Sequence, residues 1–132
     1  MSVYVLMKDE TLTGKIMQEL RIALASELTT VGELIAARVR DEVERYNRDA
    51  GEVFRGLVQP GDTELTLNGY RMAKDRRFVD AEKQVAVALA AFARNSFFVL
   101  VDDQQCGDLE QEVLIKPGTS VSFVKLTPLI GG

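Results

Sequence analysis

The chain opens with two segments whose apolar positions are those of β-strands. Residues 3–8 form a β-branched apolar run, and every second residue from 19 to 24 is apolar. Such alternation is typical of a strand with one buried face. The polar segment between them, which includes Asp9 and Gly14, supplies turn-forming residues. The pattern therefore predicts a β-hairpin with one half-buried strand.

A long amphipathic helix is predicted after the hairpin. Glu33 follows Thr30 at the spacing of a capping box, which marks a helix start. Apolar residues then recur at steps of three and four up to Tyr46, so one face of the helix is apolar. Polar residues and Gly51 follow, and we expect the helix to cover residues 31–48.

The pattern from 49 to 95 is less regular but contains a second hairpin and a second helix. Asn68-Gly69 is well suited to a two-residue turn between strands at 64–67 and 70–73. Asp80 can cap a helix in which Val85, Leu89 and Phe92 share one face.

Two apolar runs close the chain and are typical of buried strands, at 96–102 and 121–126. Residues 109–115 read as short connecting structure between them. A helix laid across one face of a mixed sheet is the simplest way to bury these apolar positions. We therefore expect an α+β fold.

Composition narrows the class of protein. With 132 residues, 46% of them hydrophobic, one domain is expected. The 16 Lys and Arg against 20 Asp and Glu argue against a nucleic-acid partner, and no apolar run is long enough for a membrane span. A cytoplasmic protein is expected. With no His and one Cys, imidazole-dependent catalysis, Cys-rich zinc sites and internal disulfides are excluded, and no metal site is predicted.

Three other features favour ordinary surface or structural positions over chemistry. Asp102-Asp103 could be a carboxylate pair, but the acids that follow make a solvated acidic shoulder the preferred interpretation. Cys106 has no neighbour in sequence that would activate it, so an inert thiol is expected. A basic cluster ahead of the second helix is interpreted as a solvated loop, with docking to an acidic partner as the alternative; its members are Arg71, Lys74, Arg76 and Arg77.

The segment after the last predicted strand, 127–132, reads Thr-Pro-Leu-Ile-Gly-Gly. Six extended residues reach about 20 Å at most, which is enough to carry a carboxylate into the active site of another protein. Gly131 and Gly132 lack side chains, so their backbone can pass a narrow channel. Pro128 stiffens the approach. We expect a flexible tail here.

Residues 97–132 resemble the closing half of the β-grasp carriers. The resemblance lies in Phe-Phe-Val-Leu-Val-Asp-Asp, in Lys-Pro-Gly-Thr-Ser-Val-Ser-Phe and in the Pro-Leu-Ile-Gly-Gly end. The small subunit of molybdopterin synthase, the thiamine sulfur carrier and ubiquitin share this plan, and the hairpin and Thr-initiated helix agree with it. The resemblance implies a single β-grasp domain with its core at 1–48 and 96–126. Residues 49–95 would be an insertion, and 127–132 the tail.

An insertion of this length resembles bacterial ubiquitin-like proteins that are substrates of small conjugation systems, several linked to antiviral defence. The resemblance implies that a ubiquitin-activating-like enzyme adenylates the Gly132 carboxylate with ATP. Gly131 would allow the end of the chain to pass through the narrow channel to the active site. A conjugating enzyme would then join it to lysines of target proteins, and a metalloprotease would remove it. The tail would be recognised through Pro128, Leu129 and Ile130. The chain would be a substrate rather than an enzyme, with no bound cofactor.

Two other functions of the same fold stay open. The first is a sulfur carrier with a C-terminal thiocarboxylate for molybdopterin, thiamine or tRNA thiolation. The second is a non-covalent binding module in which the two glycines are incidental.

A partner surface can be predicted from alternation in the two closing strands. If their odd-numbered residues face the helix, their even-numbered apolar residues point away from it. An apolar group beside the tail is a natural contact for a partner, and the alternative is that the insertion folds over it. The patch consists of Phe98, Leu100, Val124 and Leu126.

Overall fold

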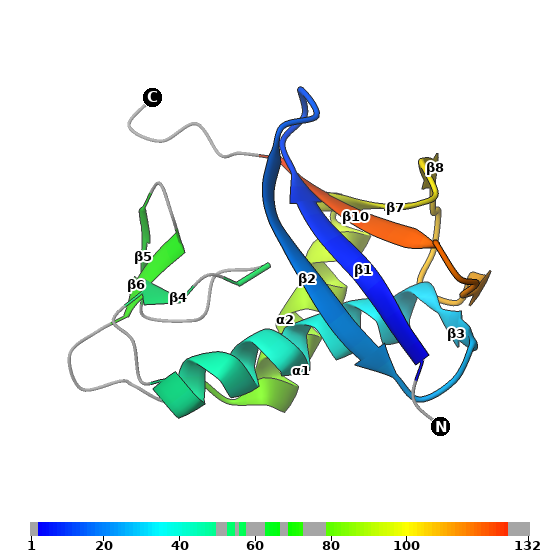
Figure 1. Cartoon of the computed structure of the whole chain (residues 1–132). Helices are drawn as coiled ribbons and strands as arrows, with labels where there is room; N and C mark the ends of the chain where they lie inside the picture. The colour runs from blue at the N-terminus through cyan, green and yellow to red at the C-terminus, as the bar shows by residue number, and fades with distance from the viewer. Residues whose placement is uncertain are drawn as a thin grey trace.

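The computed structural model describes residues 3–49, 53–54, 56–57, 63–66, 69–72 and 79–126. Figure 1 shows the elements in chain order. The N-terminal hairpin and the long helix come first, then the elements of residues 49–95, then the closing strands. The elements are β1 (Val3–Glu10), β2 (Ile16–Leu24), β3 (Leu28–Thr30), α1 (Val31–Asp49), β4 (Val53–Phe54), β5 (Thr63–Thr66), β6 (Gly69–Met72), α2 (Ala81–Ala93), β7 (Phe97–Val101), β8 (Gln104–Gln105), β9 (Glu112–Leu114) and β10 (Ser120–Lys125).

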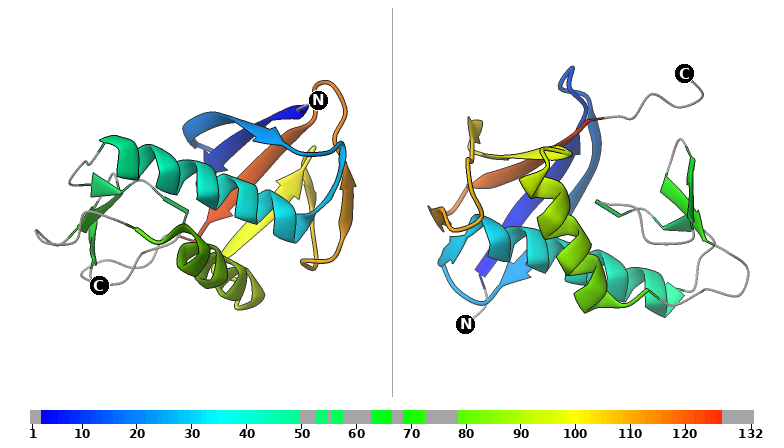
Figure 2. Two further views of the ribbon diagram at one scale, coloured as in Figure 1. Left: turned by 90° about the horizontal axis from the view of Figure 1, so that it is seen from below. Right: turned by 180° about the vertical axis from the view of Figure 1, so that it is seen from behind.

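The main sheet has five strands in the order β2-β1-β10-β7-β8. β1 runs parallel to β10, and the other neighbours are antiparallel, so the sheet is mixed. α1 crosses one face of this sheet, and α2 packs beside α1 on the same side (Figure 2). The fold is therefore α+β, as the sequence predicts. No helix of the described residues is long and apolar enough to cross a membrane.

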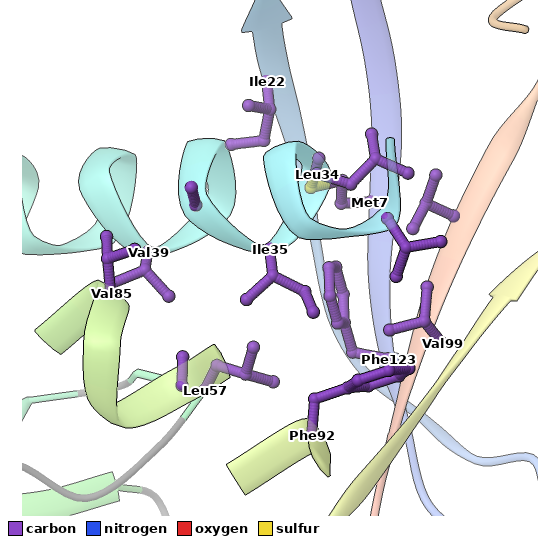
Figure 3. Packing of buried hydrophobic residues seen from close by; sticks show 14 of the residues in the cluster. Met7, Ile22, Leu34, Ile35, Val39, Leu57, Val85, Phe92, Val99 and Phe123 are labelled. Carbon is purple, nitrogen blue, oxygen red and sulfur yellow. The ribbon is translucent and has the colours of Figure 1, made fainter. Parts of the chain in front are cut away.

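The core lies between the sheet and the two helices (Figure 3). Met7, Val99 and Phe123 project from three neighbouring strands and are fully buried. They meet Leu34 and Ile35 on the apolar stripe of α1. Burial of each such side chain stabilises the fold by about 1.5–3 kcal/mol, so the period of the apolar positions decides which face each element presents.

Both helices begin where the sequence predicts. The backbone N–H of Glu33 donates to the Thr30 hydroxyl at 3.2 Å, which caps α1. The Glu33 carboxylate accepts from the Thr29 hydroxyl at 2.8 Å, so this side chain bonds one residue earlier than the usual capping box. At α2, Asp80 accepts from the N–H of Lys83 at 3.1 Å.

Asp9 does not belong to the turn of the first hairpin, so that prediction is wrong. It lies within β1, pairs with Gln18 and is buried. The turn closes after it, where the N–H of Thr11 donates to the carbonyl of Lys15 and Gly14 adopts a φ of 88°. A short polar residue favours turns by local propensity, but here a buried charge partner outweighs that preference.

Two further expectations are corrected by strand pairing. Gly69 pairs with Thr66 as the first residue of β6, so it belongs to a strand and not to the predicted turn, and Asn68 lies outside the described residues. The segment expected as connecting structure contains β9, which pairs with β3 through Thr29 and Val113. These strands are too short for their pairing to be read from alternation alone.

Candidate functional site

The predicted patch lies on the face of the sheet that α1 does not cover, here called the outer face. Val99 and Phe123 point to α1 and are fully buried, so the residues beside them point outward. Phe98 and Leu100 are half-buried there. Val124 pairs with Phe98 and is only 9% exposed, because strands flank it on both sides, whereas Leu126 after the strand is 36% exposed.

The chain leaves the sheet beside the tip of the first hairpin. Because β10 runs parallel to β1, its end lies next to the end of β1, with Val124 opposite Glu10. Exposed apolar side chains gather at this hairpin, at Leu12, Ile16 and Met17. Leu126, the last described residue, still bonds through its N–H to the carbonyl of Ser96. The predicted tail residues Pro128, Leu129, Ile130, Gly131 and Gly132 lie outside the described residues.

Residues 56–57, Val79 and α2 of the insertion pack on the α1 side of the sheet. Leu57 and the buried residues of α2 belong to the same core cluster as the inner residues of the strands (Figure 3). The side-chain amide of Asn47, near the end of α1, bonds both the N–H and the carbonyl of Val79. Residues 56–57 and α2 therefore help to complete the core behind the outer face.

Beneath the sheet lies a cluster of four ionisable side chains, which we call the charge cluster. Asp9, Arg38 and Glu42 are buried, and Lys125 is half-buried. Arg38 is 0% exposed, and its guanidinium donates to both oxygens of Asp9 and to Glu42. The Arg38–Asp9 pair is bidentate, with one contact of 2.7 Å, and the Glu42 contact measures 2.9 Å. The guanidinium also faces the ring of Phe123.

The environment shifts the pKa values in the charge cluster in different directions. Burial alone would raise the pKa of Asp9, but the hydrogen bonds and charge of Arg38 outweigh it and hold that pKa below its ordinary value. Burial raises the pKa of Glu42, against the opposing effect of Arg38. Burial likewise lowers the pKa of Lys125. Two acids and two bases thus share one site, and their formal charges balance.

The charge cluster holds part of the insertion against the core. The backbone N–H of Leu57 donates to the second Glu42 oxygen at 2.8 Å, and Lys125 donates to the carbonyl of Gly56 at 2.8 Å. Lys125 is also the last residue of β10. The residues that order 56–57 therefore include the one from which the chain leaves the sheet.

The charge cluster was not predicted from the sequence, although the spacing of charged residues in the predicted helix indicated part of it. Arg38 and Glu42 lie one helical turn apart among the apolar positions of α1, flanked by Val39 and Val43. Charged residues within an apolar stripe are rarely fully buried unless they are paired. Their spacing could have predicted an internal pair, but not the third partner, Asp9, which lies 29 residues earlier in the chain.

The acidic pair and the cysteine have structural roles. Of the predicted basic cluster, Arg71 lies in β6 and pairs with Val53, whereas Lys74, Arg76 and Arg77 lie outside the described residues. Asp102 and Asp103 form the two-residue turn between β7 and β8 with φ values of 48° and 69°. Asp102 also accepts from the N–H of Ser120 at 3.0 Å, which ties the turn to β10. Cys106 is buried, and burial raises the pKa of its thiol.

In the part of the chain that the structure describes, no group of three or more acidic or Cys side chains could hold a metal ion. The main features of the site are thus an outer apolar face beside Leu126, which we call the tail root, and a charge cluster behind that face.

No protein-family model, no curated protein and no solved structure matches this chain.

Proposed function

We propose that this chain is a ubiquitin-like protein modifier of the β-grasp superfamily. Its C-terminal Gly132 would be adenylated by an ATP-dependent activating enzyme and then joined to lysine amines of target proteins. Activation, transfer and removal belong to partner enzymes, and this chain supplies the acyl group and the surface they recognise. A bacterial conjugation pathway of the antiviral kind is the setting we propose.

The observation that carries the proposal is the position of β10. This strand lies between β1 and β7, so the tail follows directly from the middle of the sheet. A tail that is the acyl donor has to be presented to an active site while the folded body stays bound to the same enzyme. A central strand provides a rigid origin for such a tail.

The architecture agrees with the β-grasp resemblance. A hairpin is followed by a helix across a mixed sheet, and the closing strand with its Val121-Ser122-Phe123 pattern precedes the tail. Phe98, Leu100 and Leu126 give the outer face apolar character next to the tail root, where an activating enzyme would dock. This docking would orient the Gly131-Gly132 end.

The test uses covalent attachment itself. N-terminally tagged protein is incubated with a lysate of the cells that encode it, with and without ATP. Trypsin cuts after Lys125, so a conjugate would leave residues 126–132 attached to a target lysine, which mass spectrometry identifies. We expect these branched peptides only with ATP. Deletion of Gly132 should remove them, whereas Gly107→Ala, at a position with open space for a Cβ, should retain them.

The same samples distinguish the competing functions by intact mass. Replacement of one oxygen by one sulfur at the C-terminus would indicate a sulfur carrier and contradict the modifier. An unchanged mass with ATP, together with partners captured without a covalent bond, would indicate a binding module and contradict it as well.

A further inference from the structure

One long edge of the main sheet has no partner strand among the described residues. β2 has nine residues and pairs with β1 on one side only, whereas the opposite edge, β8, has two residues. An edge strand presents a row of N–H and C=O groups that can pair with another chain. Figure 1 shows β2 along this edge, and it therefore offers the longest template for strand addition on the sheet.

β2 lacks most of the features that protect edge strands. It contains no Pro and no Lys, and its one irregularity lies at its start, where the register with β1 shifts between Asp9 and Glu10. From Gln18 to the end of β2 the register is regular. Met17, at the start, is 53% exposed. A regular segment of seven residues is long enough for pairing with a second strand.

The charges on this edge strand are complementary to those of an identical strand in one register. Glu19 and Arg21 are exposed on the outer face, where the Arg21 guanidinium lies over the Tyr4 ring at 4.6 Å. Antiparallel pairing of β2 with an identical strand centred on Leu20 places Glu19 opposite the partner's Arg21, and does so twice by symmetry. If the pairing were centred on Glu19 or on Arg21, that residue would lie opposite the same residue of the partner, and like charges would meet. A pairing displaced by one residue would place inner-face residues of one strand opposite outer-face residues of the other.

We propose that a second copy of this chain pairs with β2 in this register and joins the two main sheets into one. On the inner face the two Leu20 side chains meet, and each is already half-buried against the core. The contact is small compared with the roughly 1,200–2,000 Å² of a stable interface, so the dimer is weak and depends on concentration. This proposal does not depend on the tail or on conjugation.

Charge reversal with sedimentation velocity tests the register. We expect the wild-type protein to shift from monomer to dimer as its concentration rises from micromolar to millimolar. Glu19→Arg or Arg21→Glu alone should weaken this dimer roughly tenfold, because each places like charges across both symmetric pairs. An equimolar mixture of the two variants should restore dimerisation, since one strand then carries two arginines and the other two glutamates.

Matched controls separate the register from net charge and from folding. Glu110→Arg and Arg94→Glu change the net charge equally at exposed positions away from β2 and should leave the dimer unchanged. Glu19 pairs with Lys8 in β1, so circular dichroism melting checks that Glu19→Arg stays folded. A wild-type protein that stays monomeric at millimolar concentration would overturn the proposal. So would a dimer that neither single variant weakens, or variants whose mixture remains monomeric; the edge would then be available to another protein.

Discussion

At the scale of single residues, the charge cluster is the feature that most departs from an ordinary apolar core. Arg38 joins two carboxylates that come from different elements, Asp9 from β1 and Glu42 from its own helix. A buried pair of this kind contributes little net stability compared with an apolar replacement, but removing one partner leaves an uncompensated charge. The charge cluster therefore constrains what can replace any of its members.

Replacing Arg38 tests this asymmetry. Arg38→Met removes the guanidinium that bonds both Asp9 and Glu42 and leaves Lys125 as the only cation of the charge cluster, so it should lower the free energy of unfolding by about 3–5 kcal/mol. The matched control is Arg40→Met on the same helix, which removes an ion pair to Glu82 whose side chains are 55% and 70% exposed. That pair should contribute less than about 1 kcal/mol. Urea unfolding of both variants gives the comparison, and equal losses would contradict it.

Asp9 should also make stability depend on pH. Its pKa lies below the ordinary value of 3.8 in the folded protein, so the charged form favours folding. This contribution is complete well above 3.8 and is lost as the pH falls through the folded pKa. The difference in unfolding free energy between wild type and Asp9→Asn should therefore be largest near neutral pH and shrink below 3.8. A difference that stays constant from pH 7 to pH 2 would contradict this.

At the scale of elements, the insertion is joined to the core by contacts that could not be predicted from its own sequence. Leu57 is almost fully buried in the core cluster, and its N–H donates to Glu42 (Figure 3). Asn47 ties α1 to the residue before the cap of α2. Because Leu57, Val79 and α2 share one core with the main sheet, we expect these parts of the insertion to unfold together with it.

Truncation of Leu57 measures how far the insertion shares in that core. Leu57→Ala should lower the free energy of unfolding by about 2–5 kcal/mol, because the side chain is almost fully buried. The control Leu12→Ala, at an exposed position, should change it by less than about 0.5 kcal/mol. Denaturant unfolding followed by circular dichroism should show one transition. A separate early transition for Leu57→Ala alone would indicate that the insertion unfolds independently.

At the scale of the whole molecule, the two faces of the main sheet differ in what they contact. The inner face packs on α1 and α2 and holds the charge cluster. On the outer face, Phe98 and Leu100 are half-buried and Leu126, where the described chain ends, is 36% exposed. If the proposed modifier function is right, the outer face is the surface that partner enzymes contact. Substitutions there should then affect conjugation more than stability.

Leu100→Asp provides that measurement. The side chain is half-buried on the outer face, so a carboxylate there should block docking and remove the ATP-dependent conjugates while the thermal unfolding midpoint changes by only a few degrees. Leu114→Asp is the matched control, because Leu114 is equally apolar and more exposed but lies on β9, outside the main sheet. Unchanged conjugation by Leu100→Asp, or equal loss in both variants, would exclude the patch as the docking surface.

Much of the fold was predictable because it depends on local patterns. The steps of three and four after Thr30 predicted α1, and Asp80 predicted the start of α2, since caps and amphipathic periods act within one or two turns. The apolar runs near the end predicted β7 and β10. The patch residues were predicted to point away from the helix, but their degree of burial was not, because Val124 is covered by its neighbouring strands.

The sequence, then, is enough to predict which residues of each element face inward. The spacing of apolar residues within one helix or strand shows which of its sides gains free energy by burial. The tertiary structure decided which elements meet. It paired β1 with β10 in parallel and β3 with β9, and it brought Asp9 into the strand to meet Arg38. These contacts join residues far apart in the chain, and their energy exists only once both partners have left water.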